Sequence, residues 1–280
     1  MWKDKSKTGC YEVQIICCGG TDGCRAVRLL DFRREDKDAR TLLFADGRDK
    51  GCCRRVAEPA RPDIACIEAV EPYDTDYAAT VARWRQEREA DVKVAIQPLA
   101  VNLDQYDTIF LGFPVWGGTV ASPVATFLAD NSLAGKTVVT FATFGSGGLD
   151  SATADVAAVQ PDATVVKGYG VRNARVEKAS AEITRFLIEG GYVEGEIAPL
   201  PEYGEAVPVT EEDVAVFDAA CGDYQFPLGM PVTVAKRSYD DTEDYLFDVK
   251  SQMPDGRESS STIYVVVPQG EKPEFTRVVR

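Results

Sequence analysis

Three short apolar runs most strongly limit which folds this 280-residue chain can adopt, because each is separated from the next by a segment with a different pattern. The runs are residues 106–113 (YDTIFLGF), 136–142 (KTVVTFA) and 163–167 (ATVVK), and a shorter one, Ile64–Ala69, precedes them. Strands that are apolar on both faces are buried on both faces, which is typical of parallel sheets covered by helices. The runs therefore predict buried, parallel strands.

Helical segments lie between and around these runs. Residues 77–89 (YAATVARWRQERE) predict one helix, and the pair Ser122-Pro123 is typical of the N-cap and first turn of another. Apolar residues from Val176 to Leu187 recur at helical spacing until Gly190-Gly191 ends the helix. Because helices alternate with buried strands, the sequence predicts an α/β domain with a parallel sheet.

The last third of the chain has a different pattern. Prolines and glycines mark a linker at 199–209, after which Thr210 is the expected N-cap of a helix that reaches Cys221. Four strand-like segments then follow without helices, at 231–238, 244–250, 262–268 and 273–279. We therefore predict an α/β domain over residues 41–198 and, over 210–280, a small α+β domain with one helix on a four-stranded antiparallel sheet.

Composition excludes several classes of function. The chain contains no histidine, which excludes Ser-His-Asp and Cys-His catalysis and imidazole metal ligands. It also contains no Cys-x-x-Cys pair, so a zinc or dithiol redox site has little support. A net charge of −14 argues against a nucleic-acid partner, because neutralising phosphates needs a basic surface. No apolar stretch approaches the ~18 residues that a membrane-spanning helix needs. We expect no metal, no nucleic acid and no membrane span.

Glycine-rich loops follow two of the predicted strands. One loop reads Pro114-Val115-Trp116-Gly117-Gly118-Thr119, and the other reads Thr143-Phe144-Gly145-Ser146-Gly147-Gly148. Both follow the carboxyl ends of adjacent parallel strands, where open α/β sheets bind ligands. Glycine lets backbone groups approach the edge of a planar ring, and tryptophan offers a face for stacking. The pattern favours a flat ligand with polar edges, such as an isoalloxazine; plain packing by Trp116 and plain turns at the glycines are the alternatives.

These stretches resemble the flavodoxin family, most closely the bacterial flavodoxin-like proteins with a strand–F-P-x-W–G loop, over roughly residues 62–192. The resemblance rests on YDTIFLGFPVWGGTVASPVATFL, GKTVVTFATFGSGGLDS and ATVVKGYGVRNARVEKASAEITRFL. It implies a doubly wound parallel sheet of strand order 2-1-3-4-5 and FMN as cofactor. The tail resembles, less specifically, the small cystatin-like domains found after such units; a packing or interaction module is the other interpretation.

The same resemblance implies roles for the loop residues. Trp116 would stack on the flavin, Pro114, Val115, Gly117 and Gly118 would line the edge of the ring, and Thr143, Phe144, Gly145 and Gly147 would lie across from them. Relatives often carry a second aromatic after the tryptophan. Because Gly117 stands there in this chain, we expect that side of the ring to be more open. No catalytic residue is predicted.

The Ser/Thr-rich loop with which a flavodoxin binds the FMN phosphate is missing as written. Residues 41–58 read TLLFADGRDKGCCRRVAE, where Asp46 and Asp49 would repel a phosphate. Reading residues 44–53 one nucleotide later permits F-S-R-T-G-A-T-K-x-A-A, which is close to the expected loop. We therefore interpret residues 1 to about 54 as translated out of frame; a genuine divergent segment is the alternative.

Residues 1–40 show no sustained helical or strand period and predict an irregular leader. As written, this leader has no targeting signal and favours a cytoplasmic location. In the shifted frame it has a basic stretch followed by an apolar one, which favours export to the cell envelope or beyond.

Three functions are compatible with the sequence. The first is an FMN-binding electron-transfer protein, whose acidic surface would suit a basic redox partner, with a small-molecule acceptor as the other possibility. The second is an NAD(P)H- or quinone-linked FMN reductase, which needs room over the ring for a second substrate. The third is a flavin-free binding or interaction protein on the same scaffold, which the absent phosphate loop favours.

Overall fold

A computed structural model of the chain describes residues 13–18, 63–74, 76–99, 101–192, 195–222, 224, 226, 228–252 and 256–279. The segment that the sequence predicts as the phosphate loop, between residues 41 and 58, lies outside the described residues. The chain forms two compact units. The first comprises Met1–Phe144 and Leu149–Ile197, and the second comprises Gly145–Gly148 and Ala198–Arg280.

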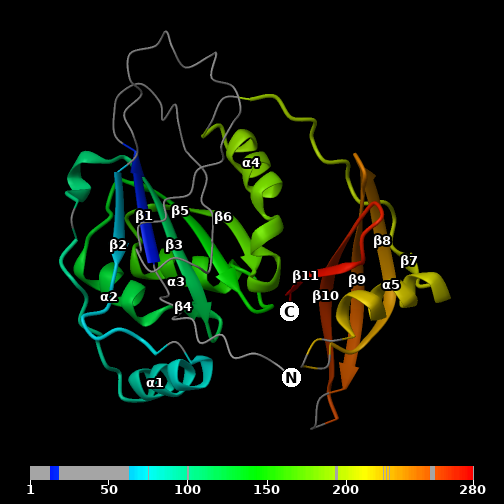
Figure 1. Cartoon of the computed structure of the whole chain (residues 1–280), viewed down its shortest axis with the longest axis horizontal. Helices are drawn as coiled ribbons and strands as arrows, with labels where there is room; N and C mark the ends of the chain where they lie inside the picture. The colour runs from blue at the N-terminus through cyan, green and yellow to red at the C-terminus, as the bar shows by residue number, and fades with distance from the viewer. Residues whose placement is uncertain are drawn as a thin grey trace, which may run out of the picture. The chain divides into compact units, whose positions relative to one another are not determined.

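The first unit contains a central sheet of strand order β2-β1-β3-β5-β6 (Figure 1). Its strands are β1 Val13–Cys18, β2 Asp63–Ile67, β3 Thr108–Trp116, β5 Thr137–Phe144 and β6 Thr164–Arg172. The short strand β4, Thr119–Val120, pairs with the end of β3. When β4 is left out of the count, this order is the predicted 2-1-3-4-5, and the three predicted strands β3, β5 and β6 run parallel.

Strand β1 departs from the sequence prediction in two ways. It lies within residues 1–40, which the sequence predicts to be irregular, and it runs antiparallel to both β2 and β3. The sheet is therefore mixed rather than wholly parallel. The physical reason is that a run as short as Val13-Gln14-Ile15-Ile16 gives no sustained period, yet its β-branched residues suit a strand that pairs on both sides.

The helices predicted at 77–89, after Ser122 and up to Leu187 are present, although Val176 belongs to a 3₁₀ turn before the last of them. The helix at 150–159 was not predicted. The α-helices of this unit are α1 Tyr77–Glu89, α2 Ser122–Asp130, α3 Asp150–Val159 and α4 Ser180–Glu189, and the 3₁₀ turns are η1 Leu103–Gln105 and η2 Asn173–Lys178. The predicted N-cap Ser122 is wrong by one residue. Ala121 is the N-cap of α2, without a side-chain hydrogen bond. A proline is tolerated throughout the first helical turn, so Pro123 does not fix which residue precedes it as the cap.

Alternate residues of β3 face two separate cores. Ile109, Leu111 and Phe113 are buried against α2 and α3, whereas Phe110 packs on the opposite face with α4. The first core includes Val124 and Phe127 of α2 with Ala152 and Val156 of α3; the second includes Ala179, Ile183 and Leu187 at the start of and along α4. Helices therefore cover both faces of the sheet (Figure 1), and the predicted doubly wound α/β fold is confirmed.

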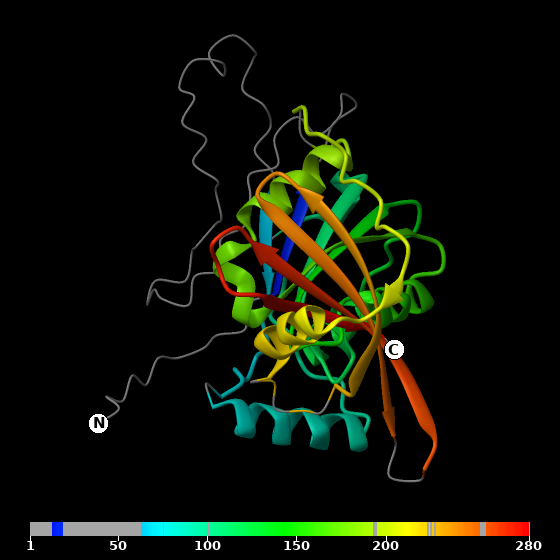
Figure 2. The ribbon, with the colours of Figure 1, turned by 90° about the vertical axis from the view of Figure 1, so that its right-hand side faces the viewer.

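The second unit is an antiparallel sheet of strand order β11-β10-β9-β8-β7, with one helix across it (Figure 2). Its elements are β7 Val207–Pro208, α5 Glu211–Cys221, β8 Met230–Tyr239, β9 Thr242–Gln252, β10 Glu258–Pro268 and β11 Glu274–Val279. Phe217 and Cys221 of α5 pack against Phe247, Ile263 and other residues of the sheet. The predicted helix and four strands are confirmed, and β7 adds a two-residue strand from the predicted linker.

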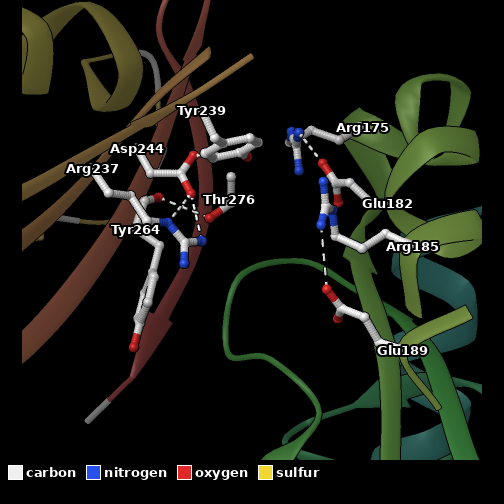
Figure 3. Close-up of polar contacts among 9 residues, drawn as sticks. All are labelled: Arg175, Glu182, Arg185, Glu189, Arg237, Tyr239, Asp244, Tyr264 and Thr276. Carbon is white, nitrogen blue, oxygen red and sulfur yellow. Dashed lines mark hydrogen bonds and ion pairs between the residues drawn. The ribbon is translucent and has the colours of Figure 1, made fainter. Parts of the chain in front are cut away.

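Ion pairs hold local structure within each unit (Figure 3). In the first unit, Arg175 pairs with Glu182 at 2.7 Å, next to the pair Arg185–Glu189 of α4. In the second unit, Arg237 of β8 donates two hydrogen bonds to Oδ2 of the buried Asp244 of β9, at 2.8 and 2.6 Å. Within the described residues, no helix is both long and apolar enough to cross a membrane.

A reciprocal cap begins α5. The Asp213 N–H donates to Oγ1 of Thr210 at 3.3 Å, and the Thr210 N–H donates to Oδ2 of Asp213 at 3.0 Å. Asp213 is 2% exposed and also pairs with Lys236 of β8. Burial by itself would raise the pKa of Asp213, but the bonds from Lys236 and Thr210 outweigh it, so the pKa lies below its ordinary 3.8.

Replacing this cap is expected to weaken the second unit. We expect Asp213→Ala to lower its stability by about 1–2 kcal/mol near neutral pH, because the helix loses its cap while the partly exposed Lys236 returns to water. The lowered pKa means that the ionised carboxylate stabilises the fold above pH 3.8 and that this contribution is lost as the pH falls through the folded-state value. Amide hydrogen exchange of α5 measures the effect. The exposed Asp218→Ala in the same helix is the control, and equal losses in both variants would contradict the prediction.

Candidate functional site

The first glycine loop is a tight β-hairpin. Val115 pairs with Val120 and Trp116 pairs with Thr119, which leaves Gly117 and Gly118 as the turn. Their φ angles are +56° and +87°. A two-residue turn of type I′ requires positive φ at both central positions, which glycine adopts without steric cost. Both glycines are exposed, so the turn presents bare backbone at the carboxyl end of β3.

The second predicted loop begins at the same edge of the sheet. In the parallel register of β3 and β5, Pro114 lies opposite Thr143. These two residues are half-buried, whereas Phe144 is buried with its ring close to Gly170. The structure therefore brings Thr143 next to the first loop and places the Phe144 side chain in the core.

The two remaining predicted residues, Gly145 and Gly147, are exposed and belong to the second unit. Between them, Ser146 is bonded within that unit. The carbonyl of Ser146 accepts from the Val278 N–H at 3.0 Å, and its Oγ is hydrogen-bonded to the hydroxyl of Tyr224. The roles of Gly145 and Gly147 at a flavin ring stay predictions.

Trp116 is held by a neighbouring aromatic ring. Tyr73 meets it edge to face, with ring centroids 4.9 Å apart and planes inclined at 70°. Trp116 is half-buried and also packs against the core below α2 and α3. An edge-to-face neighbour fixes the orientation of an indole. Trp116 thus packs against the core, and it also has the fixed orientation that a stacking residue needs.

Tyr73 is itself fixed by two charged side chains of α1. Its hydroxyl donates to Oε2 of Glu87 at 2.5 Å, while Arg83 Nε donates to Oε1 of the same carboxylate at 2.7 Å. The Arg83 guanidinium lies 4.0 Å from the centre of the Tyr73 ring, and its Nη1 donates to the carbonyls of Glu71 and Pro72. Burial and the bond to Glu87 raise the pKa of Tyr73 far above its ordinary 10.0. This partly buried network anchors α1 beside the hairpin.

A second contact between α1 and the hairpin fills the space that the sequence leaves open. A Cβ on Gly117 would lie 2.0 Å from Cη2 and 2.6 Å from Cζ2 of Trp84. The indole of Trp84 therefore occupies the position of the missing side chain. The expectation that Gly117 makes this side of the site more open is wrong in this structure.

Sequence reasoning missed four residues next to the first loop: Tyr73, Arg83, Trp84 and Glu87. Their helical spacing predicts that Arg83, Trp84 and Glu87 share one side of α1, since residues three and four apart are neighbours on a helix. The spacing does not say which loop that side contacts. A hollow of about 530 Å³ also lies along α1. It is lined by Val70, Glu71, Arg83, Gln86, Glu87, Ala90, Val92, Lys93, Val94 and Ala95, and none of the predicted ring-binding residues is among them.

The described residues contain no group of three or more acidic or cysteine side chains that could hold a metal ion. The residues of the first loop, with Thr143, offer backbone amides, hydroxyls and the aromatic face of Trp116. Such groups can bind and orient a planar ligand.

Comparisons with known proteins give a family match and several similar solved structures. The model of a family described as Flavodoxin matches residues 40–185. Among solved structures, the chain is 22% identical to a flavoprotein from Lactobacillus acidophilus NCFM in complex with FMN, over 40% of this chain and 76% of that chain, with a TM-score of 0.32. No curated protein matches the sequence.

Two Bacteroides proteins assigned as flavoproteins are similar to the same extent. The protein from Bacteroides uniformis ATCC 8492 is 25% identical over 40% of this chain and 76% of that chain, with a TM-score of 0.32. The protein from Bacteroides eggerthii DSM 20697 is 25% identical over 43% of this chain and 78% of that chain, with a TM-score of 0.33.

Removing the Tyr73 hydroxyl tests the network that supports Trp116. We expect Tyr73→Phe to cost about 1 kcal/mol of stability below pH 10, because Glu87 loses a buried donor. The raised pKa means that the phenol stabilises the fold fully below the ordinary value of 10.0, and that this contribution fades as the pH rises above it. The difference between wild type and variant therefore shrinks in alkaline solution. Urea unfolding followed by tryptophan fluorescence measures it.

The matched control is Tyr77→Phe. Tyr77 is the first residue of α1 and is 71% exposed, so we expect this substitution to leave the stability unchanged. An equal loss in both variants, or a difference that does not depend on alkaline pH, would show that the hydroxyl of Tyr73 does not hold the network.

Proposed function

Because this chain belongs to the flavodoxin family, whose model matches just over half of it at residues 40–185, we propose that it binds FMN and transfers electrons between partners. The observation that carries the proposal is the hairpin at the end of β3, where an oriented tryptophan adjoins an exposed two-glycine turn. A fold alone does not determine function, so the residues of the site must support the proposal.

The residues at the end of β3 and β5 fit the ring of a flavin. Gly117 and Gly118 present backbone donors and acceptors without side chains, and Trp116 offers an aromatic surface held by Tyr73. Pro114, Val115 and Thr143 complete the half-buried wall beside them. Bound FMN would supply reversible transfer of one or two electrons, while these residues bind and orient its ring and limit its contact with water.

The phosphate end of FMN is a separate question. Its expected loop lies outside the described residues, and as written it carries Asp46 and Asp49. A phosphate dianion gains charge-assisted hydrogen bonds from backbone N–H groups and loses them where carboxylates face it. Ring contacts and phosphate contacts therefore have to be measured separately.

A carrier is favoured over a reductase by the position of Trp84. The reductase hypothesis relied on free space beside Gly117, and Trp84 fills that space. We therefore propose electron transfer between separate partners rather than oxidation of a bound nicotinamide.

Titration of the full chain with FMN tests the proposal directly. We expect quenching of flavin and tryptophan fluorescence on binding, and about tenfold weaker binding in Trp116→Ala, because aromatic stacking is worth about 1–3 kcal/mol. Trp116→Phe keeps an aromatic face and is expected to bind within a few-fold of wild type. Tyr77→Ala, which removes an exposed aromatic from α1, is the control. If the protein is colourless after incubation with excess FMN and removal of the unbound flavin, the flavin-free function is favoured.

Riboflavin, which lacks the phosphate, separates the two halves of the ligand in the same assay. Equal affinities for riboflavin and FMN would mean that the chain as written makes no useful phosphate contact. Tighter binding of FMN would mean that residues beyond the described segments supply one.

The acidic net charge of the chain supports the proposal of a basic redox partner. With a net charge of −14, we expect electron transfer to a basic one-electron acceptor protein to slow as ionic strength rises, because salt screens the attraction that brings the proteins together. Stopped-flow reoxidation of the reduced chain measures the rate. A neutral quinone is the control acceptor, and a protein rate as insensitive to salt as the quinone rate would contradict this partner.

A further inference from the structure

Trp84 belongs to neither predicted loop, yet its ring edge contacts the turn at the end of β3. The contact is close enough that no side chain could be added at Gly117 without moving the indole, since the nearest ring atom would lie 2.0 Å from the new Cβ. Gly118 differs, because a Cβ there would meet nothing within 4 Å. The indole thus lies on one side of the turn and leaves the other side open.

The geometry of the turn explains why a helix supplies this group. Positive φ at position 117 favours glycine, so the loop cannot place a side chain of its own there without strain. The gap has to be filled from a neighbouring element or by a ligand. Trp84 fills it from α1, which is anchored close by through the contacts of Tyr73 with Glu87 and Trp116.

Trp84 is also held in place without being buried completely. The guanidinium of Arg88, one turn further along α1, lies 5.5 Å from the centre of its ring, a cation–π distance. The side chain is half-buried, so part of the indole stays accessible, and Gly117, which it contacts, is exposed. An accessible, oriented aromatic beside bare backbone amides has the properties of a wall for a planar ligand.

We propose that Trp84 is the second aromatic wall of the flavin site, and that it determines which molecules reach the ring by closing the side next to Gly117. This inference rests on the proposed function. Trp116 comes from β3 and Trp84 from α1, so the two walls are set by different elements. Removing Trp84 should loosen the flavin and open the ring to small acceptors.

The contact itself is tested without flavin, by a double-mutant cycle of Gly117→Ala and Trp84→Ala. Gly117→Ala should lower the midpoint of thermal unfolding by at least about 3 °C more than Gly118→Ala, because both strain a positive φ but only the first also meets the indole. In the Trp84→Ala background this excess should disappear. An excess that persists there would show that Trp84 does not fill the space beside Gly117.

The role of Trp84 toward flavin is tested by affinity and by access. We expect Trp84→Ala to raise the dissociation constant for FMN about tenfold, with Trp84→Phe within about threefold of wild type and Tyr77→Ala unchanged. Reoxidation of the reduced flavin by a neutral quinone should be faster in Trp84→Ala than in wild type. If Trp84→Ala binds FMN as tightly as wild type, or more tightly, the inference is overturned while the proposed function stands.

A wild-type chain that binds no FMN overturns the proposed function, and with it the flavin role of Trp84. The double-mutant cycle still decides the contact between Trp84 and Gly117 in that case, because it needs no ligand. Failure of the proposed function and failure of the inference about Trp84 are therefore distinguished by different measurements.

Discussion

The turn at Gly117-Gly118 is the constraint on which the candidate site depends. Strand β3 lies inside the sheet, with alternate residues packed against helices on opposite faces, so its path and its end point are fixed by the core. A two-residue hairpin at that end point needs positive φ at both positions, which removes both side chains from the loop. Everything that a ligand could touch there besides backbone must come from Trp116 or from other elements. The site is therefore shaped as much by α1 as by the loop.

Helix α1 is held at the hairpin by a buried charge. Glu87 is 9% exposed, and a buried carboxylate is costly unless hydrogen bonds and an opposite charge compensate it. Tyr73 and Arg83 provide both, and Arg83 also ties the segment before α1 through the carbonyls of Glu71 and Pro72. The same tyrosine touches Trp116. A polar network thus sets the orientation of an apolar surface, which explains why sequence spacing alone does not reveal the surface.

The sequence predicts the elements better than their contacts. Continuous apolar runs at 106–113 and 136–142 identify β3 and β5, and the Thr210 cap identifies the start of α5, because burial and capping leave local patterns. Strand β1 could not be predicted, since its pairing depends on β2 and β3 rather than on its own period. The position of Trp84 against Gly117 is likewise a tertiary contact between distant segments, and a helical period cannot show it. The glycines predict the turn but not what fills the space beside it.

The balance between ring and phosphate contacts follows from charge. A chain of net charge −14 has an average potential that opposes a phosphate dianion, so only N–H groups or cationic side chains within about 8–10 Å, inside the screening length, could favour one. Contacts of an uncharged ring with aromatic side chains and glycine backbone do not carry this penalty and depend little on salt. Trp84, which contacts Gly117, and Trp116 beside it are of this second kind. The more of the binding free energy that Trp84 and Trp116 supply, the less the site needs a phosphate loop, and the smaller the difference between FMN and riboflavin becomes.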